Sequence, residues 1–98
     1  MIKHIVLFNW KPDTCPSTVD DIMAALAELQ SKIDGIVDYC AGPCDGDEGM
    51  NQGYTHGFIM TFDTSASRDA YLPHPEHKKV VDVILPVVDS VLAFDFEA

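Results

Sequence analysis

The chain has 98 residues and a formal net charge of −10 at pH 7, and 47% of its residues are hydrophobic. This length predicts a single domain over 1–98 with a core of its own, and the apolar fraction excludes a disordered chain. The scarcity of Lys and Arg argues against binding to nucleic acid or to anionic membrane surfaces. No segment approaches the roughly 18 apolar residues of a membrane-spanning helix and no secretion signal is recognisable, so we expect a cytoplasmic protein.

Alternation at the N-terminus predicts a strand over 2–10. A helix is expected next, with Ser17 or Thr18 as its N-cap and Gly35 as its stop signal. A second strand is expected over 36–42. One side of the first strand and the helical stripe are almost entirely apolar: Ile2, His4, Val6, Phe8 and Trp10 on the strand, and Val19, Ile22, Met23, Leu26, Leu29 and Ile33 on the helix.

An acidic, glycine-rich segment over 43–53 has neither helical nor strand periodicity and predicts a loop. A third strand is expected over 54–62 because its aromatic residues alternate with small or polar ones. A short helix over 65–72 then stops at a proline, and a second proline fits the first turn of another helix over 75–85. Alternation predicts the last strand over 90–97.

This order of elements predicts an α+β, ferredoxin-like fold, in which helices cover one face of a four-stranded antiparallel sheet of order 4-1-3-2. The aromatic-rich side expected to meet the helices carries Val6, Phe8, Phe58, Phe62, Phe94 and Phe96. The opposite side is also apolar and carries Ile5, Leu7, Val37, Tyr39 and Ile59. Helices on one side cannot cover both, and an exposed apolar patch usually marks a protein interface. We therefore predict a two-fold homodimer formed through the open sheet face.

The histidines could border one interior space. Strand parity turns His4 and His56 toward the helices, and His77 shares the inward stripe of its helix with Val81 and Ile84. Tyr71 closes the preceding helix beside it. The sequence therefore predicts a small-molecule pocket between sheet and helices. Its expected residues are Tyr71 and His77 as the catalytic pair, and His4, His56, Phe8, Leu26 and Phe58 as substrate-binding residues.

Tyr71 and His77 suit acid–base chemistry. The positive end of the helix dipole disfavours imidazolium in the first turn, so a neutral imidazole is expected for His77. Such a ring can accept a proton while a tyrosine donates one to a developing oxyanion. Enolisation, aldol chemistry or isomerisation would fit, without a redox cofactor. The alternative is structural, since such a histidine often bonds nearby backbone and Tyr71 can anchor a chain reversal.

His74 and His77 also form an H-x-x-H pair that could suggest zinc. The proline between them places His74 at the helix cap, and zinc would need a further ligand from His4 or His56. We therefore predict no metal site.

The acidic loop and the cysteines give weaker signals. The loop lacks the glutamate that closes an EF-hand, and the sequence does not decide whether it closes over the pocket. Three cysteines make an odd number, and the spacing of Cys40 and Cys44 is a weak pattern for a disulfide or a metal. Reduced thiols are expected.

Four stretches together resemble the stress-responsive alpha/beta barrel family of small dimeric ferredoxin-like proteins. They are Lys3-His4-Ile5-Val6-Leu7-Phe8, Gly53-Tyr54-Thr55-His56, Tyr71-Leu72-Pro73-His74-Pro75-Glu76-His77 and Leu92-Ala93-Phe94-Asp95-Phe96. The resemblance implies a dimer whose two sheets form a barrel. One branch of the family contains polyketide cyclases that close a linear chain by an aldol step. By that resemblance Tyr71 and His77 would act as acid and base, with His4 and His56 lining the pocket.

Two functions follow as alternatives. In the first, the chain is a small dimeric enzyme or binding protein for a carbonyl-containing, polyketide-like metabolite. In the second, it is a non-catalytic stress-responsive dimeric protein with structural histidines. The first requires a cavity of at least ~300 Å³ that reaches Tyr71 and His77, whereas the second predicts that side chains fill this space. The inward face of the first helix, with Leu26 at its centre, offers no aromatic residue to shape a polyketide pocket.

Overall fold

The computed structural model describes every residue of the chain, 1–98, and its helices and strands follow the predicted order. They are β1 (Ile2–Trp10), α1 (Pro16–Lys32), β2 (Ile36–Pro43), β3 (His56–Phe62), α2 (Ser65–Tyr71), α3 (Pro75–Ile84) and β4 (Val88–Glu97).

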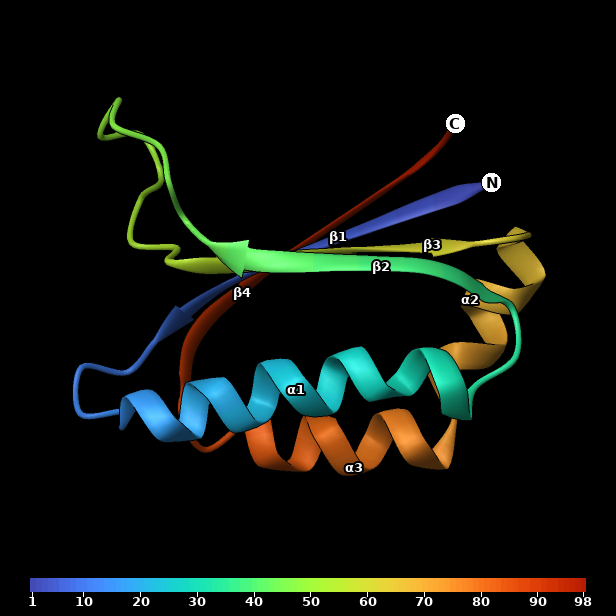
Figure 1. Cartoon of the computed structure of the whole chain (residues 1–98), viewed down its shortest axis with the longest axis horizontal. Coiled ribbons are helices and arrows are strands. Elements are labelled where there is room, and N and C mark those ends of the chain that lie inside the picture. The colour runs from blue at the N-terminus through green and yellow to red at the C-terminus, as the bar shows by residue number, and fades with distance from the viewer.

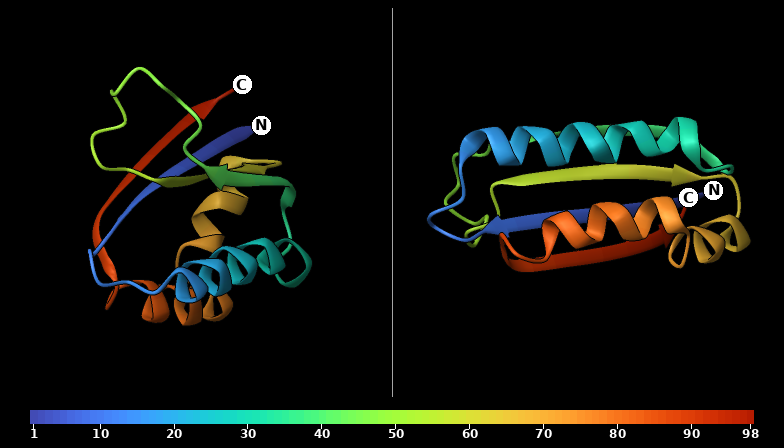
Figure 2. Two further views of the ribbon diagram at one scale, coloured as in Figure 1. Left: turned by 60° about the vertical axis from the view of Figure 1, so that its left-hand side comes forward. Right: turned by 90° about the horizontal axis from the view of Figure 1, so that it is seen from below.

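The four strands form one antiparallel sheet in the order β2-β3-β1-β4. Both α1 and α3 lie side by side under one face of this sheet, and α2 lies at the end of the sheet near the two chain termini (Figures 1 and 2). This arrangement confirms the predicted ferredoxin-like fold with its helices on one face. None of the helices combines the length and apolar character needed to cross a bilayer.

The core lies between the sheet and the helices. The predicted stripe of α1 is buried at Val19, Ile22, Leu26 and Leu29. Ile22, Leu26 and Leu29 belong to the same buried cluster as Phe62 of β3, which has no exposed surface. Burying a side chain of this size stabilises the fold by about 1.5–3 kcal/mol, so this layer fixes the helices on the sheet.

The N-terminus of α1 differs from the prediction. The helix begins at Pro16, and Cys15 occupies the N-cap position without a side-chain hydrogen bond. The predicted capping by Ser17 or Thr18 is therefore wrong. Proline fits the first turn because its φ is already helical and because its missing N–H would have no partner there.

The two phenylalanines of β4 lie on the opposite side from the one predicted. Phe94 pairs with Ile5 and Phe96 pairs with Lys3, and opposed residues of antiparallel strands share a face. Phe94 is 63% exposed and Phe96 is 45% exposed, so neither meets the helices. The prediction failed because both alternating sets of β4 contain apolar residues, and only the pairing with β1 decides which set faces inward.

Tyr39 also lies on the unexpected side. Ile36 pairs with Phe62 but Asp38 pairs with Thr61, so β2 carries one extra residue at this point. Such a bulge reverses the alternation of the residues that follow it. Tyr39 consequently packs against the core, with its ring 5.5 Å from that of Phe58. Burial of the phenol raises the pKa of Tyr39 to about 12, and it stays neutral.

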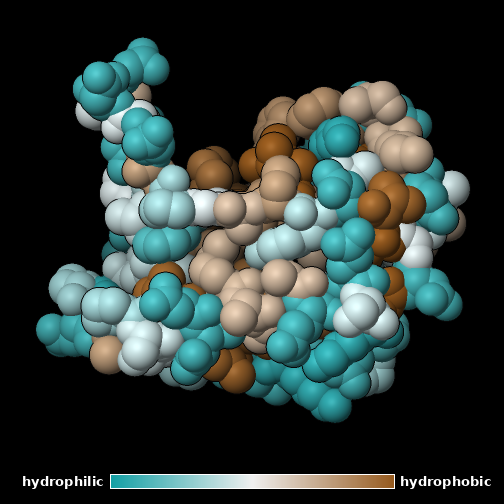
Figure 3. All heavy atoms as spheres, in the orientation of Figure 1, coloured by the Kyte–Doolittle hydropathy of each residue, from teal (hydrophilic) through white to brown (hydrophobic).

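We define the open face as the side of the sheet that no helix covers. Its members include Lys3, Ile5, Leu7, Asp38, Cys40, Gly42, Gly57, Ile59, Thr61, Leu92, Phe94 and Phe96. The loop over 44–55 rises from the sheet on this side, away from the helices (Figures 1 and 2). Hydrophobic residues gather along the upper edge of the molecule, in the hollow beside the raised loop (Figure 3).

Candidate functional site

A cavity of about 300 Å³ lies between the helix-facing side of the sheet and the helices. Eleven of its thirteen lining residues are hydrophobic, so any polar group inside meets a medium of low dielectric. Exposed residues on its solvent-facing side include Leu72, Leu85 and Val91. Six of the residues singled out from the sequence line it, namely His4, Phe8, Leu26, Phe58, Tyr71 and His77.

His77 enters the cavity from the first turn of α3. Its Nδ1 lies 2.9 Å from the carbonyl oxygen of Leu72. A carbonyl only accepts, so Nδ1 carries the proton and Nε2 keeps its lone pair. Burial lowers the pKa of His77, and the charges of His4 and His74 act in the same direction, while the bond to Leu72 opposes them. The ring is therefore a neutral proton acceptor at pH 7.

Tyr71 ends α2 and has no exposed surface. Its ring packs against that of His77, with centroids 4.2 Å apart and planes tilted by 36°. Burial raises the pKa of Tyr71 well above its ordinary value. The phenol remains protonated across the physiological range, so it can donate a hydrogen bond but cannot serve as a base.

His4 lies on β1 with only 7% of its surface exposed. Its ring sits about 6 Å, centroid to centroid, from those of Phe58, Phe62 and Tyr71. Its Nδ1 lies 2.6 Å from Oδ1 of Asp95 on β4. The ionised carboxylate is an acceptor, so Nδ1–H donates and Nε2 is the nitrogen left to meet a ligand.

Sequence reasoning missed Asp95 and its second partner, Arg68, whose Nη1 lies 2.8 Å from Oδ2 of Asp95. Asp95 was not predicted because it alternates with Phe94 and Phe96. These two were expected to face the helices, which would have turned Asp95 to the opposite side. The pairing of His4 opposite Asp95 identifies it, but this contact joins residues 91 positions apart in the sequence. No local pattern predicts such a contact.

His56 does not reach this cavity, so its predicted place there is wrong. It is the first residue of β3 and pairs with Phe8, whereas His4 pairs with Met60 further along the sheet. Its Nδ1 accepts a hydrogen bond from Nε1 of Trp10 at 3.1 Å. The alternation of the strand correctly predicted that His56 lies on the helix-facing side of the sheet. Its position along the strand, however, places it at the end of the sheet away from His4.

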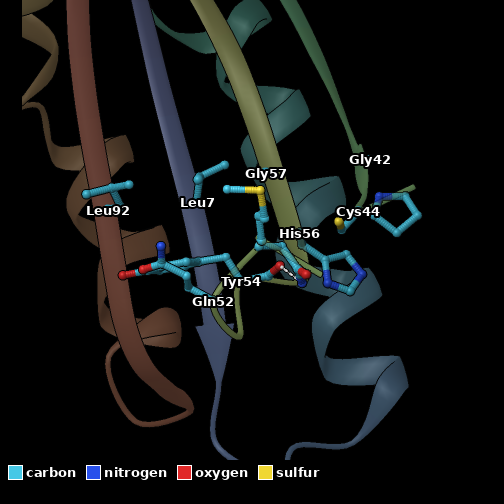
Figure 4. A pocket seen from close by; sticks show the side chains of 11 residues that line it. Leu7, Gly42, Cys44, Gln52, Tyr54, His56, Gly57 and Leu92 are labelled. Atoms are coloured by element: carbon cyan, nitrogen blue, oxygen red, sulfur yellow. Dashed lines mark hydrogen bonds between the residues drawn. The ribbon is translucent and has the colours of Figure 1, made fainter. Parts of the chain in front are cut away.

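A second cavity, of about 420 Å³, lies at the base of the loop (Figure 4). It opens on the open face, where Leu7 of β1 and Leu92 of β4 line it beside Gln52 and Tyr54 of the loop. His56 also lines this cavity, which is the larger of the two. The close contact between a tyrosine ring and a histidine ring, however, is that of Tyr71 and His77 in the first cavity. The loop borders this cavity, and none of its residues lines the one that contains His4.

His74 has a structural task. It is the N-cap residue of α3, and its Nδ1 accepts the backbone N–H of Glu76 at 3.1 Å. The first histidine of the H-x-x-H pair therefore caps the N-terminus of the helix. This agrees with the expectation that the proline places His74 at the cap.

The sequence matches the profile of the stress responsive A/B barrel domain family over residues 2–98. The chain belongs to this family. The family predicted by resemblance is therefore confirmed, and the match covers all seven helices and strands.

Individual relatives cover nearly the whole chain. The stress-response A/B barrel domain-containing protein HS1 of Arabidopsis thaliana is 28% identical over 98% of this chain and 88% of its own length. Olivetolic acid cyclase of Cannabis sativa is 23% identical over 97% of this chain and 94% of its own. A solved dimeric ferredoxin-like protein from Jannaschia sp. CCS1 superposes with a TM-score of 0.88 at 26% identity, over 99% of this chain and 98% of that one.

Proposed function

We propose that this chain binds a small carbonyl compound in the cavity between sheet and helices and activates it by acid–base chemistry. The observation that supports this most strongly is the close ring contact between Tyr71 and His77 at one apolar cavity of about 300 Å³. Cavities of this size hold small ligands, and a few convergent polar groups in an apolar wall fix their orientation. The relationship to a named cyclase is consistent with this proposal.

The proposed step is enolisation. Nε2 of His77 takes the proton from the carbon next to the carbonyl. The electron pair of that C–H bond forms the C=C bond of the enolate, and the π electron pair of the carbonyl moves onto its oxygen. The O–H of Tyr71 donates a hydrogen bond to this oxygen as it becomes negative. The apolar wall strengthens that bond because no water competes for the oxyanion. The enolate can then be reprotonated or can attack a second carbonyl of the same molecule.

The test uses methyl pentyl ketone in deuterium oxide, because exchange of the protons beside its carbonyl reports enolisation directly. We expect the protein to accelerate this exchange, and we expect Tyr71→Phe or His77→Gln to lower the acceleration by at least about 100-fold. Methyl pentyl carbinol, the matching alcohol, should bind in the same cavity without exchange at carbon. Binding without accelerated exchange would leave a ligand-binding protein. Neither binding nor exchange, for this ketone and for longer ketones and diketones, would favour the non-catalytic alternative.

We further propose that two copies associate through their open faces. Ile59, Leu92, Phe94 and Phe96 are each between 38% and 63% exposed on this face, which leaves a large apolar surface in contact with water. The solved relative from Jannaschia is described as dimeric. Sedimentation velocity over a range of protein concentrations tests this proposal, and a sharp monomer boundary at every concentration would contradict it.

A further inference from the structure

Asp95 lies between two positively polarised partners that come from different elements. Its Oδ1 lies 2.6 Å from Nδ1 of His4 on β1, and its Oδ2 lies 2.8 Å from Nη1 of Arg68 on α2. Both carboxylate oxygens are therefore engaged, one by each partner. A carboxylate held at both oxygens cannot rotate freely, so the contact to Arg68 fixes the direction in which Asp95 meets His4.

Arg68 is itself held from a second side. Its Nε lies 2.8 Å from Oδ1 of Asp69, the next residue of α2, and its side chain is only 23% exposed. The guanidinium is therefore anchored on the helix by Asp69 and reaches the sheet through Asp95. Burial opposes ionisation of Asp95, but the hydrogen bonds from His4 and Arg68 outweigh it and lower its pKa. The carboxylate stays charged beside the imidazole.

The groups that surround His4 come from three directions. Asp95 faces it from β4, and Arg68 contacts the far side of Asp95 from α2. Tyr71 packs against its ring from α2, and His77 of α3 lines the same cavity. Of these, Asp95 accepts the Nδ1 proton. A neutral imidazole that donates from Nδ1 has its acceptor at Nε2.

We propose that Arg68 and Asp95 are positioning residues that hold His4 in the Nδ1–H tautomer and present its Nε2 to the ligand in the cavity. This inference rests on the proposed function, because it gives the same cavity a second imidazole acceptor beside that of His77. The two rings then differ in what sets their tautomer. A backbone carbonyl fixes His77, whereas an ion pair that spans sheet and helix fixes His4.

The test measures the His4 tautomer in long-range ¹H–¹⁵N correlation spectra of the ligand-free protein, at a pH where the histidines are neutral. In the parent protein we expect a single Nδ1–H tautomer. Arg68→Met removes the anchor, so we expect a mixture of the two tautomers and an upward shift in the titration of the Asp95 carboxyl. Arg68→Lys keeps the charge but not the planar guanidinium. Its ratio of His4 tautomers should lie between that of the parent and that of Arg68→Met.

Asp69→Ala is the matched control, because it removes the other hydrogen-bond acceptor of Arg68 and leaves the contact with Asp95. It should keep the tautomer and the Asp95 titration of the parent. If Arg68→Met does not fold, the nearly isosteric Asp95→Asn carries the test, and His4 should lose its tautomer preference there.

The proposal is overturned if the parent His4 carries its proton on Nε2, or if Arg68→Met and Asp95→Asn both retain the parent tautomer. No ligand enters these measurements. Their failure would remove the positioning role and leave the enolisation proposal standing. A failed exchange experiment would leave the tautomer result intact.

Discussion

On its helix-facing side the sheet places His4 opposite Asp95 within a layer of buried aromatic rings, whereas on its open face Lys3 contacts Thr61 among aromatic rings that water reaches. Both faces are rich in apolar side chains. Only the first has helices to exclude water from its polar groups, and there the hydrogen bonds are short and the pKa values are shifted. The comparison teaches that the same alternating strand can build a site on one side and leave a surface for a partner on the other.

The largest expected effect comes from emptying the core side. Phe62 has no exposed surface, so Phe62→Ala should lower the free energy of unfolding by about 3–5 kcal/mol. Phe96→Ala is the matched change on the open face. Because Phe96 is 45% exposed in the single chain, its loss should matter only at protein concentrations where two copies associate. Denaturant unfolding at low and high concentration checks both variants, and equal losses at low concentration would contradict the difference between the faces.

A charge on the open face should break the proposed association without unfolding the chain. Phe94→Asp puts a carboxylate at the most exposed aromatic position of this face, where a second copy would bury it without a partner. We expect the dissociation constant of the dimer to rise at least about 100-fold in sedimentation experiments. Val83→Asp is the control, since Val83 is 55% exposed but lies on α3, away from the open face. An unchanged dimer in Phe94→Asp would remove this face from the interface.

A smaller effect is expected where the turn before β2 approaches α2 on the helix side. Gly35 has φ of +94°, and a Cβ there would lie 2.6 Å from Cβ of Ser67. Gly35→Ala should therefore destabilise the fold by about 1–3 kcal/mol in thermal or denaturant unfolding. Gly46→Ala, in the loop on the other side, meets nothing closer than 3.9 Å and should be nearly neutral. A neutral Gly35→Ala would mean that the turn can move away from α2.

The smallest expected effect is a dependence of the stability on pH that originates at His77, on the helix-facing side of the sheet. The pKa of His77 is lower in the folded chain than its ordinary value, so the unfolded chain binds the proton more readily. Stability should therefore fall as the pH drops below about 6.5, the ordinary histidine value. His77→Gln should flatten this part of the curve of melting temperature against pH. Asp95 does not interfere, because its lowered pKa confines its contribution to more acidic solutions. Equal curves for the two proteins would contradict a neutral, desolvated His77.

The sequence was sufficient where one alternating or helical set was clearly more apolar than the other. The stripe of α1 and the inward side of β1 could be read in this way, and with the order of elements they gave the fold. The two ends of the cavity wall, His4 and His77, followed from the same reasoning. The same reasoning failed on β4, because only the pairing with β1 shows that Asp95 and not Phe94 faces inward. It also failed at Tyr39, because a bulge in β2 reverses the alternation there.

The missed part of the site has the same cause. Asp95 and Arg68 acquire a role only when β4 lies beside β1 and the end of α2 reaches the sheet. Parity correctly turned His56 toward the helices, but it does not say how far along the sheet a residue lies. Such positions depend on strand register, which is set by long-range pairing and not by local periodicity.

Trp10 is the single tryptophan of the chain. Its indole stacks on Phe8, which lines the cavity, with ring centroids 4.8 Å apart, and it donates its N–H to His56. Fluorescence excited at wavelengths that tryptophan absorbs and tyrosine does not therefore originates at one indole, which touches the wall of the site on one side and an imidazole on the other. Occupancy of the cavity can therefore be followed by the tryptophan emission of the unlabelled protein.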